Sequence, residues 1–224
     1  MSYWKIFKTL LEKDFRLEVR TREGIIAVLV FSLLSLLIFN MIMPGEKTDS
    51  AILTGIFWVV VTFSSILALD RSITRDFREK SIQGILLIPV DKSVIYLAKL
   101  TFNLFIVFFI EIATFLILTV LFNLSVGFDN AIFFLFISLL VGIGLSSSGT
   151  LYATVSQKTR SKELLLPLLF IPVVLPLLMA GINLGSAQLS GKKGVNLNWM
   201  TLILLFDFLY LALGNWLYEI MITD

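Results

Sequence analysis

Six long apolar stretches, separated by short polar segments, dominate the hydrophobic pattern of this chain. The shortest has 19 residues, which as an α-helix spans about 28 Å, close to the roughly 30 Å hydrocarbon core of a bilayer. Backbone groups in lipid must be hydrogen-bonded within their own segment, so each stretch is expected to be helical. The pattern predicts six transmembrane helices, at Gly24–Met43, Ala51–Leu69, Leu100–Phe122, Ala131–Val155, Leu164–Leu184 and Trp199–Tyr218.

The first 23 residues have a different, amphipathic pattern. On a helical wheel, one stripe holds Trp4, Phe7, Leu11 and Phe15, and the opposite face holds Lys5, Lys13, Arg16 and Arg20. An aromatic apolar stripe opposite a basic face is typical of a helix that lies in the headgroup plane. The alternative is a charged flank that only sets the orientation of the first span. Because stripe and charges are segregated, we favour an interfacial helix over residues 1–23.

The composition agrees with an all-α membrane protein of one transmembrane domain, residues 1–224. Hydrophobic residues make up 58% and charged residues 15% of the chain, whereas soluble domains are about 45–50% apolar and about 25% charged. This excludes a cytosolic globular enzyme, a disordered tail and a fibre. The chain has no Cys and no His, which excludes disulfides, thiolate catalysis, the common zinc sites and His-ligated haem. It also has no Walker A motif, so it does not bind ATP through a P-loop.

Lys and Arg alternate strongly between the two sides that six spans would create. The N-terminal segment and every second connection together hold 15 of these residues, and the other connections hold 3. Positively charged residues are retained on the cytoplasmic side. We therefore predict that both termini are cytoplasmic.

The segment at residues 70–92, between the second and third spans, is the strongest candidate for a partner contact. Its first half has mixed charges, and its second half is a short apolar run that Pro89 ends. The run is too short to cross the membrane, and a plain charged loop, which is the alternative, does not need it. We expect this coupling segment to dock a cytoplasmic partner through Arg71, Arg75, Asp76, Arg78, Glu79, Ile85, Leu86, Leu87, Ile88 and Pro89.

Two acidic residues, Glu111 and Asp207, lie inside predicted spans. A charged carboxylate in lipid is costly, so each should face the bundle interior, water or another subunit. One hypothesis gives them a substrate or coupling role, and the other makes them structural hydrogen-bonding groups.

Small residues and prolines mark two of the later spans. Gly142, Ser146, Gly149 and Ala153 recur at three- and four-residue spacing, which favours close helix packing. The same stretch could suggest a dinucleotide site or an intramembrane serine protease, but no strand precedes it and a chain without His lacks the usual base. Three prolines at positions 167, 172 and 176 predict a kinked fifth span.

Several short segments of the sequence resemble those of a known family, and the resemblance covers essentially the full chain. They are Gly55–Val59, Leu67–Arg71, Leu86–Pro89, Ala98–Lys99 and the stretch from Leu164 to Pro176. With six spans and an amphipathic lead, the chain resembles the membrane subunit of an ABC-2-type transporter. More narrowly, it resembles the haem exporter protein B family (CcmB) of bacterial cytochrome c maturation.

The resemblance implies a non-catalytic, permease-like subunit in the bacterial cytoplasmic (inner) membrane. The implied partners are a cytoplasmic ATPase (CcmA), a haem-handling membrane protein (CcmC), a small helper (CcmD), a periplasmic haem chaperone (CcmE), membrane lipid and a second copy in a homodimer, with no nucleic acid. The partner would use ATP, haem is a candidate substrate, and no cofactor is assigned to this chain. The implied action couples ATP hydrolysis to release of the haem-loaded chaperone.

Three other hypotheses stay open at this point. The chain could be an ABC-2 exporter subunit for another amphipathic substrate, or a non-transporting scaffold for the ATPase. A proton-coupled carrier that uses Glu111 and Asp207 is disfavoured, because the sequence shows no inverted repeat and no basic partner within a span.

Overall fold

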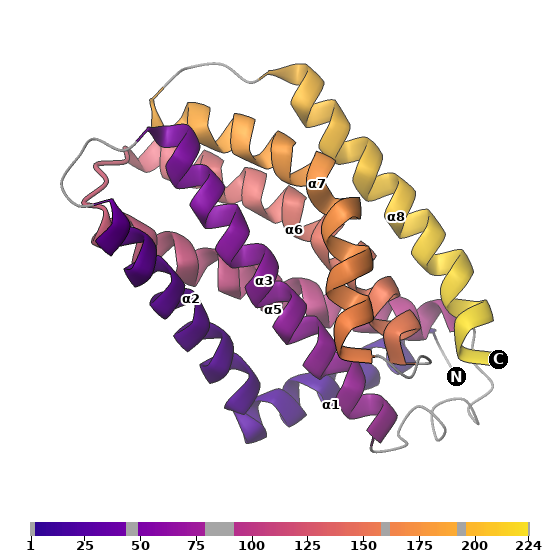
Figure 1. Ribbon diagram of the computed structural model, residues 1–224. Coiled ribbons are helices and arrows are strands. Elements are labelled where there is room, and N and C mark those ends of the chain that lie inside the picture. Colours follow the sequence, from indigo (N-terminus) through magenta and orange to yellow (C-terminus); the bar gives the residue numbers. More distant parts are fainter. Residues whose placement is uncertain (1–2, 44–48, 79–91, 158–161, 192–195, 224) are drawn as a thin grey trace.

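The computed structural model describes residues 3–43, 49–78, 92–157, 162–191 and 196–223. This part of the chain is a bundle of seven helices (Figure 1). In chain order they are α1 (Tyr3–Thr21), α2 (Glu23–Ile42), α3 (Ser50–Arg78), α5 (Lys92–Leu121), α6 (Phe128–Gln157), α7 (Lys162–Leu189) and α8 (Leu197–Thr223).

The six helices from α2 to α8 correspond one to one to the six predicted spans. Within the described residues, all six are long and apolar enough to cross a membrane. Their ends differ from the prediction mainly on one side of the bundle. There, α3 continues to Arg78, past the predicted end at Leu69, and α5 begins at Lys92, before the predicted start at Leu100. Charged residues ended the apolar runs but did not end the helices, because ion pairs hold their side chains.

Helix α6 is the centre of the bundle and packs against α3, α5, α7 and α8. Its small residues make this possible, as the sequence predicted. A Cβ atom at Gly149 would collide with the side chain of Leu69, and a Cβ at Gly142 would lie 3.0 Å from Oε1 of Glu111. Ser146 and Ala153 are fully buried on the same helix. The small side chains therefore bring neighbouring helices close enough for their side chains to touch the α6 backbone.

Helix α7 bends along its length, as its three prolines predict (Figure 1). Leu166, Phe170 and Val174 form its buried side at four-residue spacing. Pro172 and Pro176 lie on the exposed side. The prolines thus change the direction of the helix without entering its packed face.

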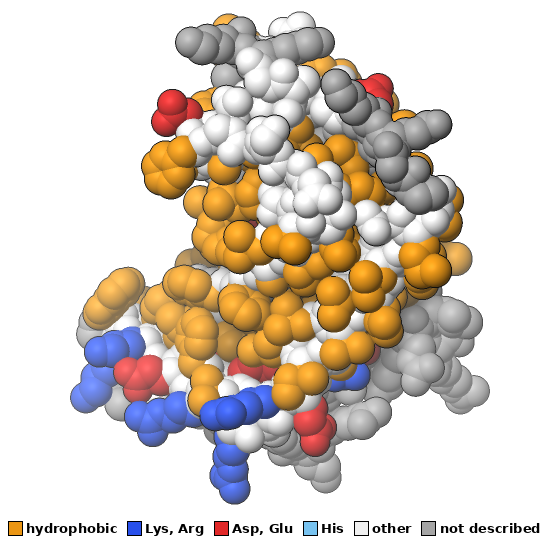
Figure 2. Space-filling view, turned by 90° about the vertical axis from the view of Figure 1, so that its left-hand side faces the viewer, with side chains coloured by type: hydrophobic (Ala, Val, Ile, Leu, Met, Phe, Trp, Pro, Cys, Tyr) orange, Lys and Arg blue, Asp and Glu red, His pale blue; other side chains and the backbone are white. Residues whose placement is uncertain are grey.

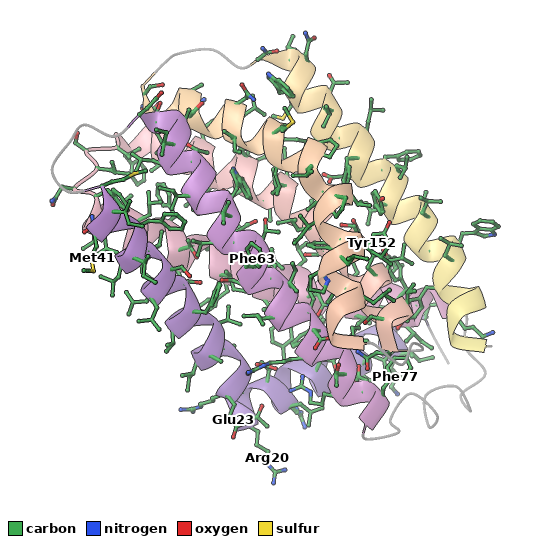
Figure 3. All side chains as sticks on the ribbon, viewed as in Figure 1. Arg20, Glu23, Met41, Phe63, Phe77 and Tyr152 are labelled. Carbon is green, nitrogen blue, oxygen red and sulfur yellow. The ribbon has the colours of Figure 1, made fainter. Side chains whose placement is uncertain are left out.

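The amphipathic helix α1 lies across the end of the bundle at which α3 ends (Figure 1). It turns into α2 at Arg22, whose φ of 53° lies in the left-handed region. Arg20 and Glu23 project from this corner, at the opposite end of α2 from Met41 (Figure 3). Figure 2 shows Lys and Arg side chains gathered at this end of the molecule, below a broad hydrophobic surface. This distribution is the one that an interfacial helix beside six membrane spans requires.

Candidate functional site

A network of four charged side chains, three of them buried, joins α1 to the adjacent ends of α3 and α5. Lys99 of α5 lies 3.2 Å from Oδ2 of Asp14 on α1 and 2.5 Å from Oδ2 of Asp76 on α3. Lys13 of α1 lies 3.1 Å from Oδ1 of Asp76 and 3.2 Å from Oδ1 of Asp14. Asp14, Asp76 and Lys99 are each at most 5% exposed. We call these four residues the charged junction.

Two positive and two negative groups make the charged junction neutral overall, which allows it to be buried. An isolated buried ion costs several kcal/mol, and pairing offsets that cost only where the remaining protons and lone pairs are bonded. Burial acts to lower the pKa of Lys13, but the carboxylates of Asp76 and Asp14 outweigh it, so the pKa lies above its ordinary value. Lys13 therefore stays charged throughout the physiological pH range.

A second ion pair extends the contact between α1 and α3. Arg75 donates through Nη1 to Oε2 of Glu18 at 3.1 Å, and both side chains are largely buried. One turn earlier on α3, the exposed Arg71 donates through Nη1 to the backbone carbonyl of Glu23, at 3.2 Å. Together with the charged junction, these bonds fix the last two turns of α3 against the α1–α2 corner.

The structure divides the predicted docking residues into groups. Arg71 is exposed, whereas Arg75 and Asp76 point towards α1 and are engaged by Glu18, Lys13 and Lys99. The remaining predicted docking positions lie outside the described residues or have side chains outside them: Arg78, Glu79, Ile85, Leu86, Leu87, Ile88 and Pro89. Docking at this segment stays a prediction. What the structure adds is that both helices flanking the segment, α3 and α5, are tied to α1.

Sequence reasoning missed Asp14, Glu18 and Lys99. A signal for the first two was present, because on the helical wheel of α1 Glu18 falls within the aromatic stripe and Asp14 at its edge, away from the polar face. An acidic residue on the apolar face of an amphipathic helix indicates a buried cationic partner, since an unpaired buried charge is strongly disfavoured. The partners, Lys99 for Asp14 and Arg75 for Glu18, lie 85 and 57 residues away in the chain, so they could not be identified from this signal.

The two intramembrane acids both face the glycine-rich part of α6. Glu111 of α5 is fully buried against Gly142. Asp207 of α8 is nearly buried, and a Cβ at Gly144 would lie 2.6 Å from its Oδ1. Within the described part of the chain, both carboxyl oxygens of Glu111 and Oδ1 of Asp207 have no hydrogen-bond partner. Neither acid faces lipid, as the cost of a charge in the membrane requires.

Two buried hydroxyl groups, those of Thr114 and Ser138, lie about one helical turn from the level of Glu111 in the bundle. Helices α5 and α6 are antiparallel, with Phe115 stacked on Phe134 at 4.7 Å and Asn103 donating to Thr150 at 2.8 Å. Thr114 and Ser138 therefore lie at one common level, about one turn along the bundle from Glu111 and Gly142. The hydroxyls that are buried and unpaired among the described residues are those of Thr62, Ser65, Ser72, Thr114, Ser138 and Ser146. We call Glu111 with Thr114 and Ser138 the polar layer.

The described residues contain no group of three or more acidic side chains that could hold a metal ion. The polar layer instead offers one carboxyl group among hydroxyls, each of which can donate and accept a proton in a hydrogen bond. Such a layer can hold helices in register, or it can bind a polar group or a proton that passes through the bundle. In the described structure, by contrast, both carboxylates of the charged junction are paired with lysines, so the junction serves to attach α1 to α3 and α5.

Comparisons with known proteins agree with this architecture. The family model described as "CcmB protein" matches residues 5–216. Proteins named "Heme exporter protein B" are similar: that of Haemophilus influenzae is 27% identical over 78% of each chain, and that of Rhodobacter capsulatus is 29% identical over 79% of this chain and 81% of its own. The Escherichia coli K12 protein of the same name is 31% identical over 100 residues, so the match spans under half of that relative, 44% of either chain. Because the family model covers nearly the whole chain, this protein belongs to the CcmB family.

Proposed function

We propose that this chain is the membrane subunit of an ABC-type complex for haem export or delivery in c-type cytochrome biogenesis. The observation that carries the proposal is the CcmB match over residues 5–216, together with relatives named heme exporter protein B. The absence of a Walker A motif from the sequence supports a division of labour in which a separate ATPase chain hydrolyses ATP. The chain itself is then not an enzyme.

The charged junction supplies a physical route for coupling in this proposal. The predicted docking segment includes the end of α3 and connects it to α5 in the chain, and Lys99 pairs directly with Asp76 across these two helices. Asp14 and Lys13 attach α1 to the same point. A force that an ATPase applies to the segment would therefore move α3, α5 and α1 as one unit, and α5 carries Glu111 into the polar layer around α6. Packed elements of this kind move as rigid bodies.

The partners and the substrate belong to the proposal as well. The ATPase would be CcmA-like, and the membrane partners would be a CcmC-like haem-handling protein and a CcmD-like helper. A CcmE-like chaperone would receive haem on the periplasmic side, a second copy of the chain would form a homodimer, and haem would be a substrate rather than a resident cofactor. An exporter of another amphipathic substrate would have the same architecture, whereas a pure scaffold would need the junction but not the intramembrane acids.

The decisive experiment is restoration of c-type cytochromes in a bacterium that lacks its own family member. The chain, expressed with its cognate ATPase, should restore c-type cytochromes, because it then has both the docking segment and the charged junction that couple the ATPase to the membrane helices. Replacing residues 79–91 by a Gly/Ser linker and Arg71 by Glu should lower ATPase co-purification at least about tenfold, as loss of a charged, apolar interface would. A matched control is Lys8→Glu with Arg16→Glu, two exposed basic positions on α1.

The outcomes separate the hypotheses. Normal ATPase co-purification with the linker variant would contradict docking at this segment. If the unaltered chain binds the ATPase but does not restore c-type cytochromes, a scaffold or an exporter of another substrate would explain the result better.

The orientation can be measured because the chain has no Cys. The charge asymmetry supports a location in the bacterial inner membrane with both termini in the cytoplasm. We expect Asp129→Cys and Asn196→Cys, two exposed positions at the end of the bundle far from α1, to react with a membrane-impermeant maleimide in intact cells. Lys8→Cys should react only after permeabilisation. The reverse pattern would invert the proposed topology and remove the cytoplasmic docking site.

A further inference from the structure

A small cavity lies within the charged junction, and α8 reaches it through Tyr218. The cavity has about 20 Å³ of space for the centre of a water molecule. All four residues of the charged junction line it, together with Leu10, Ile95, Ala98 and Tyr218. Helix α8 packs against α5, α6 and α7. The cavity is therefore the place at which α8 also meets charged residues of α1 and α3.

The size and polarity of this cavity fit one water molecule, which needs roughly 10–15 Å³ of such space and two to four polar partners. Oδ1 of Asp14 is buried and has no hydrogen-bond partner among the described residues, although Nζ of Lys13 lies 3.2 Å from it. The hydroxyl group of Tyr218 lies within electrostatic range of Asp76 and Asp14, and it can both donate and accept a hydrogen bond. The charges of the junction cancel, so a neutral molecule suits the cavity better than an ion.

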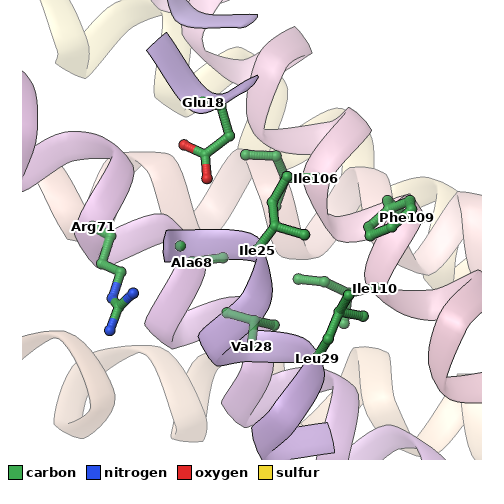
Figure 4. A pocket seen from close by; sticks show the side chains of 10 residues that line it. Glu18, Ile25, Val28, Leu29, Ala68, Arg71, Ile106, Phe109 and Ile110 are labelled. Atoms are coloured by element: carbon green, nitrogen blue, oxygen red, sulfur yellow. The ribbon is translucent and has the colours of Figure 1, made fainter. Parts of the chain in front are cut away.

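A second cavity, between α2, α3 and α5, provides a comparison (Figure 4). Its volume is also about 20 Å³. Apart from Glu18 and Arg71, its lining residues are apolar, and the buried Ala68 of α3 is among them. Apolar cavities stay dry, because a water inside them would lack hydrogen-bond partners. The two cavities therefore have the same size but differ in their capacity to hold water.

We propose that one ordered water molecule in the junction cavity bridges the hydroxyl group of Tyr218 to Asp14, and that Tyr218 is thereby a positioning residue for α8. A water-mediated bond of this kind is enthalpically nearly as favourable as a direct hydrogen bond. The bridge adds α8 to the unit of α1, α3 and α5 that the charged junction holds together.

The consequence concerns the two intramembrane acids, and it rests on the proposed function. Glu111 lies 12 residues beyond Lys99 on α5, and Asp207 lies 11 residues before Tyr218 on α8. These separations correspond to rises of about 18 Å and about 17 Å along the two helices. Both acids face the glycine-rich part of α6. A displacement of the junction would therefore move both acids along α6 together.

Matched substitutions in the two cavities test for the water, by thermal unfolding of the purified full chain in detergent. Val and Thr side chains have nearly the same shape, but only Thr carries a hydroxyl group that can replace a water. We expect Ala98→Val to unfold about 2–4 °C below Ala98→Thr, because it displaces the water without replacing its hydrogen bonds. In the apolar cavity, Ala68→Val should be at least as stable as Ala68→Thr. If Ala98→Val is as stable as Ala98→Thr, the junction cavity is dry and the proposal is overturned.

The part of Tyr218 is tested in the same assay with Tyr218→Phe, which removes only the hydroxyl group. By itself it should lower the unfolding midpoint by about 2–4 °C. Combined with Ala98→Val it should add almost nothing, because the water that it bonds is already displaced. The control is Tyr210→Phe, whose hydroxyl group lies 3.4 Å from that of Tyr152, and its effect should be unchanged by Ala98→Val. Additive losses for Tyr218→Phe and Ala98→Val would contradict the bridge.

A distance measurement separates positioning from stability. The chain has no Cys, so spin labels can be attached at Lys8→Cys on α1 and Asn215→Cys on α8, two exposed positions. We expect Tyr218→Phe to broaden the distribution of distances between the labels, and Tyr210→Phe to leave it unchanged. Equal widths for Tyr218→Phe and the unaltered chain would refute the positioning role. Both measurements use the purified chain without an ATPase, so their outcome does not depend on the proposed function.

Discussion

Replacement of Lys99 by Met should destabilise this protein more than any other single charge removal on the α1 side of the bundle. The change leaves Asp14 and Asp76 buried with Lys13 as their remaining cation in the charged junction. Removal of one partner from a buried ion network costs about 3–5 kcal/mol, because the other charges stay buried without compensation. We expect less folded protein and a lower unfolding midpoint in detergent, with α1 becoming accessible to protease.

The matched control is Lys8→Met on α1. Lys8 is 69% exposed and lies 4.0 Å from Glu12, so its loss should change the free energy of unfolding by less than about 1 kcal/mol. The double variant Lys99→Met/Asp14→Asn removes one charge of each sign from the charged junction. It should recover part of the lost stability, since the remaining Lys13–Asp76 pair is neutral. If Lys99→Met unfolds at the same midpoint as Lys8→Met, the charged junction is not a stabilising attachment.

Replacement of Glu111 by Leu is expected to lower the amount of assembled complex, whereas Glu111→Gln should assemble normally. Leucine would place a branched apolar side chain of different shape against the α6 backbone at Gly142, where the Glu111 side chain now packs closely, at a cost of about 1–3 kcal/mol. Glutamine has nearly the same shape and can both donate and accept. Asp207→Leu and Asp207→Asn repeat the comparison on the other acid that faces α6.

Cytochrome output in the two amide variants then assigns the role of the acids. Normal assembly with reduced c-type cytochromes in Glu111→Gln or Asp207→Asn would place that carboxyl group in a transport or coupling pathway. Normal assembly with full output would make it a structural hydrogen-bonding group. If all four variants assemble and function fully, neither acid contributes to the mechanism, and the polar layer has no functional role.

The membrane spans could be predicted from the sequence because their cause is local. A bilayer requires a fixed apolar length and backbone bonds within each segment, so Trp199–Tyr218 or Gly24–Met43 can be identified without knowledge of any neighbour. The packing face of α6 followed for the same reason, since Gly142 and Gly149 at helical spacing mark a close approach whatever the partner is. The spacing did not identify the partners. Gly142 faces Glu111, and Gly149 faces Leu69 and Phe170.

The helix ends depended on tertiary contacts. Asp70 and Arg71 looked like the start of a connecting segment, because charged residues normally leave the hydrocarbon core. The structure continues α3 to Arg78, and the contacts of Arg75 with Glu18 and of Asp76 with Lys99 explain how the helix retains these charges. The prediction of residues 70–92 as one surface segment therefore placed two inward-facing side chains among the docking candidates.

The charged junction illustrates what only the folded chain decides. The sequence determined that the chain has six spans, an amphipathic lead and an excess of cations on one side, since hydrophobic length and charge count are properties of single segments. Asp14, Asp76 and Lys99 come from three helices far apart in the chain. Asp76 and Lys99 look like ordinary charges beside a span, and the position of Asp14 indicates a buried partner without identifying it. Coulomb attraction strong enough to keep buried ions acts over only a few ångströms, so their pairing exists only once packing has brought α1, α3 and α5 together.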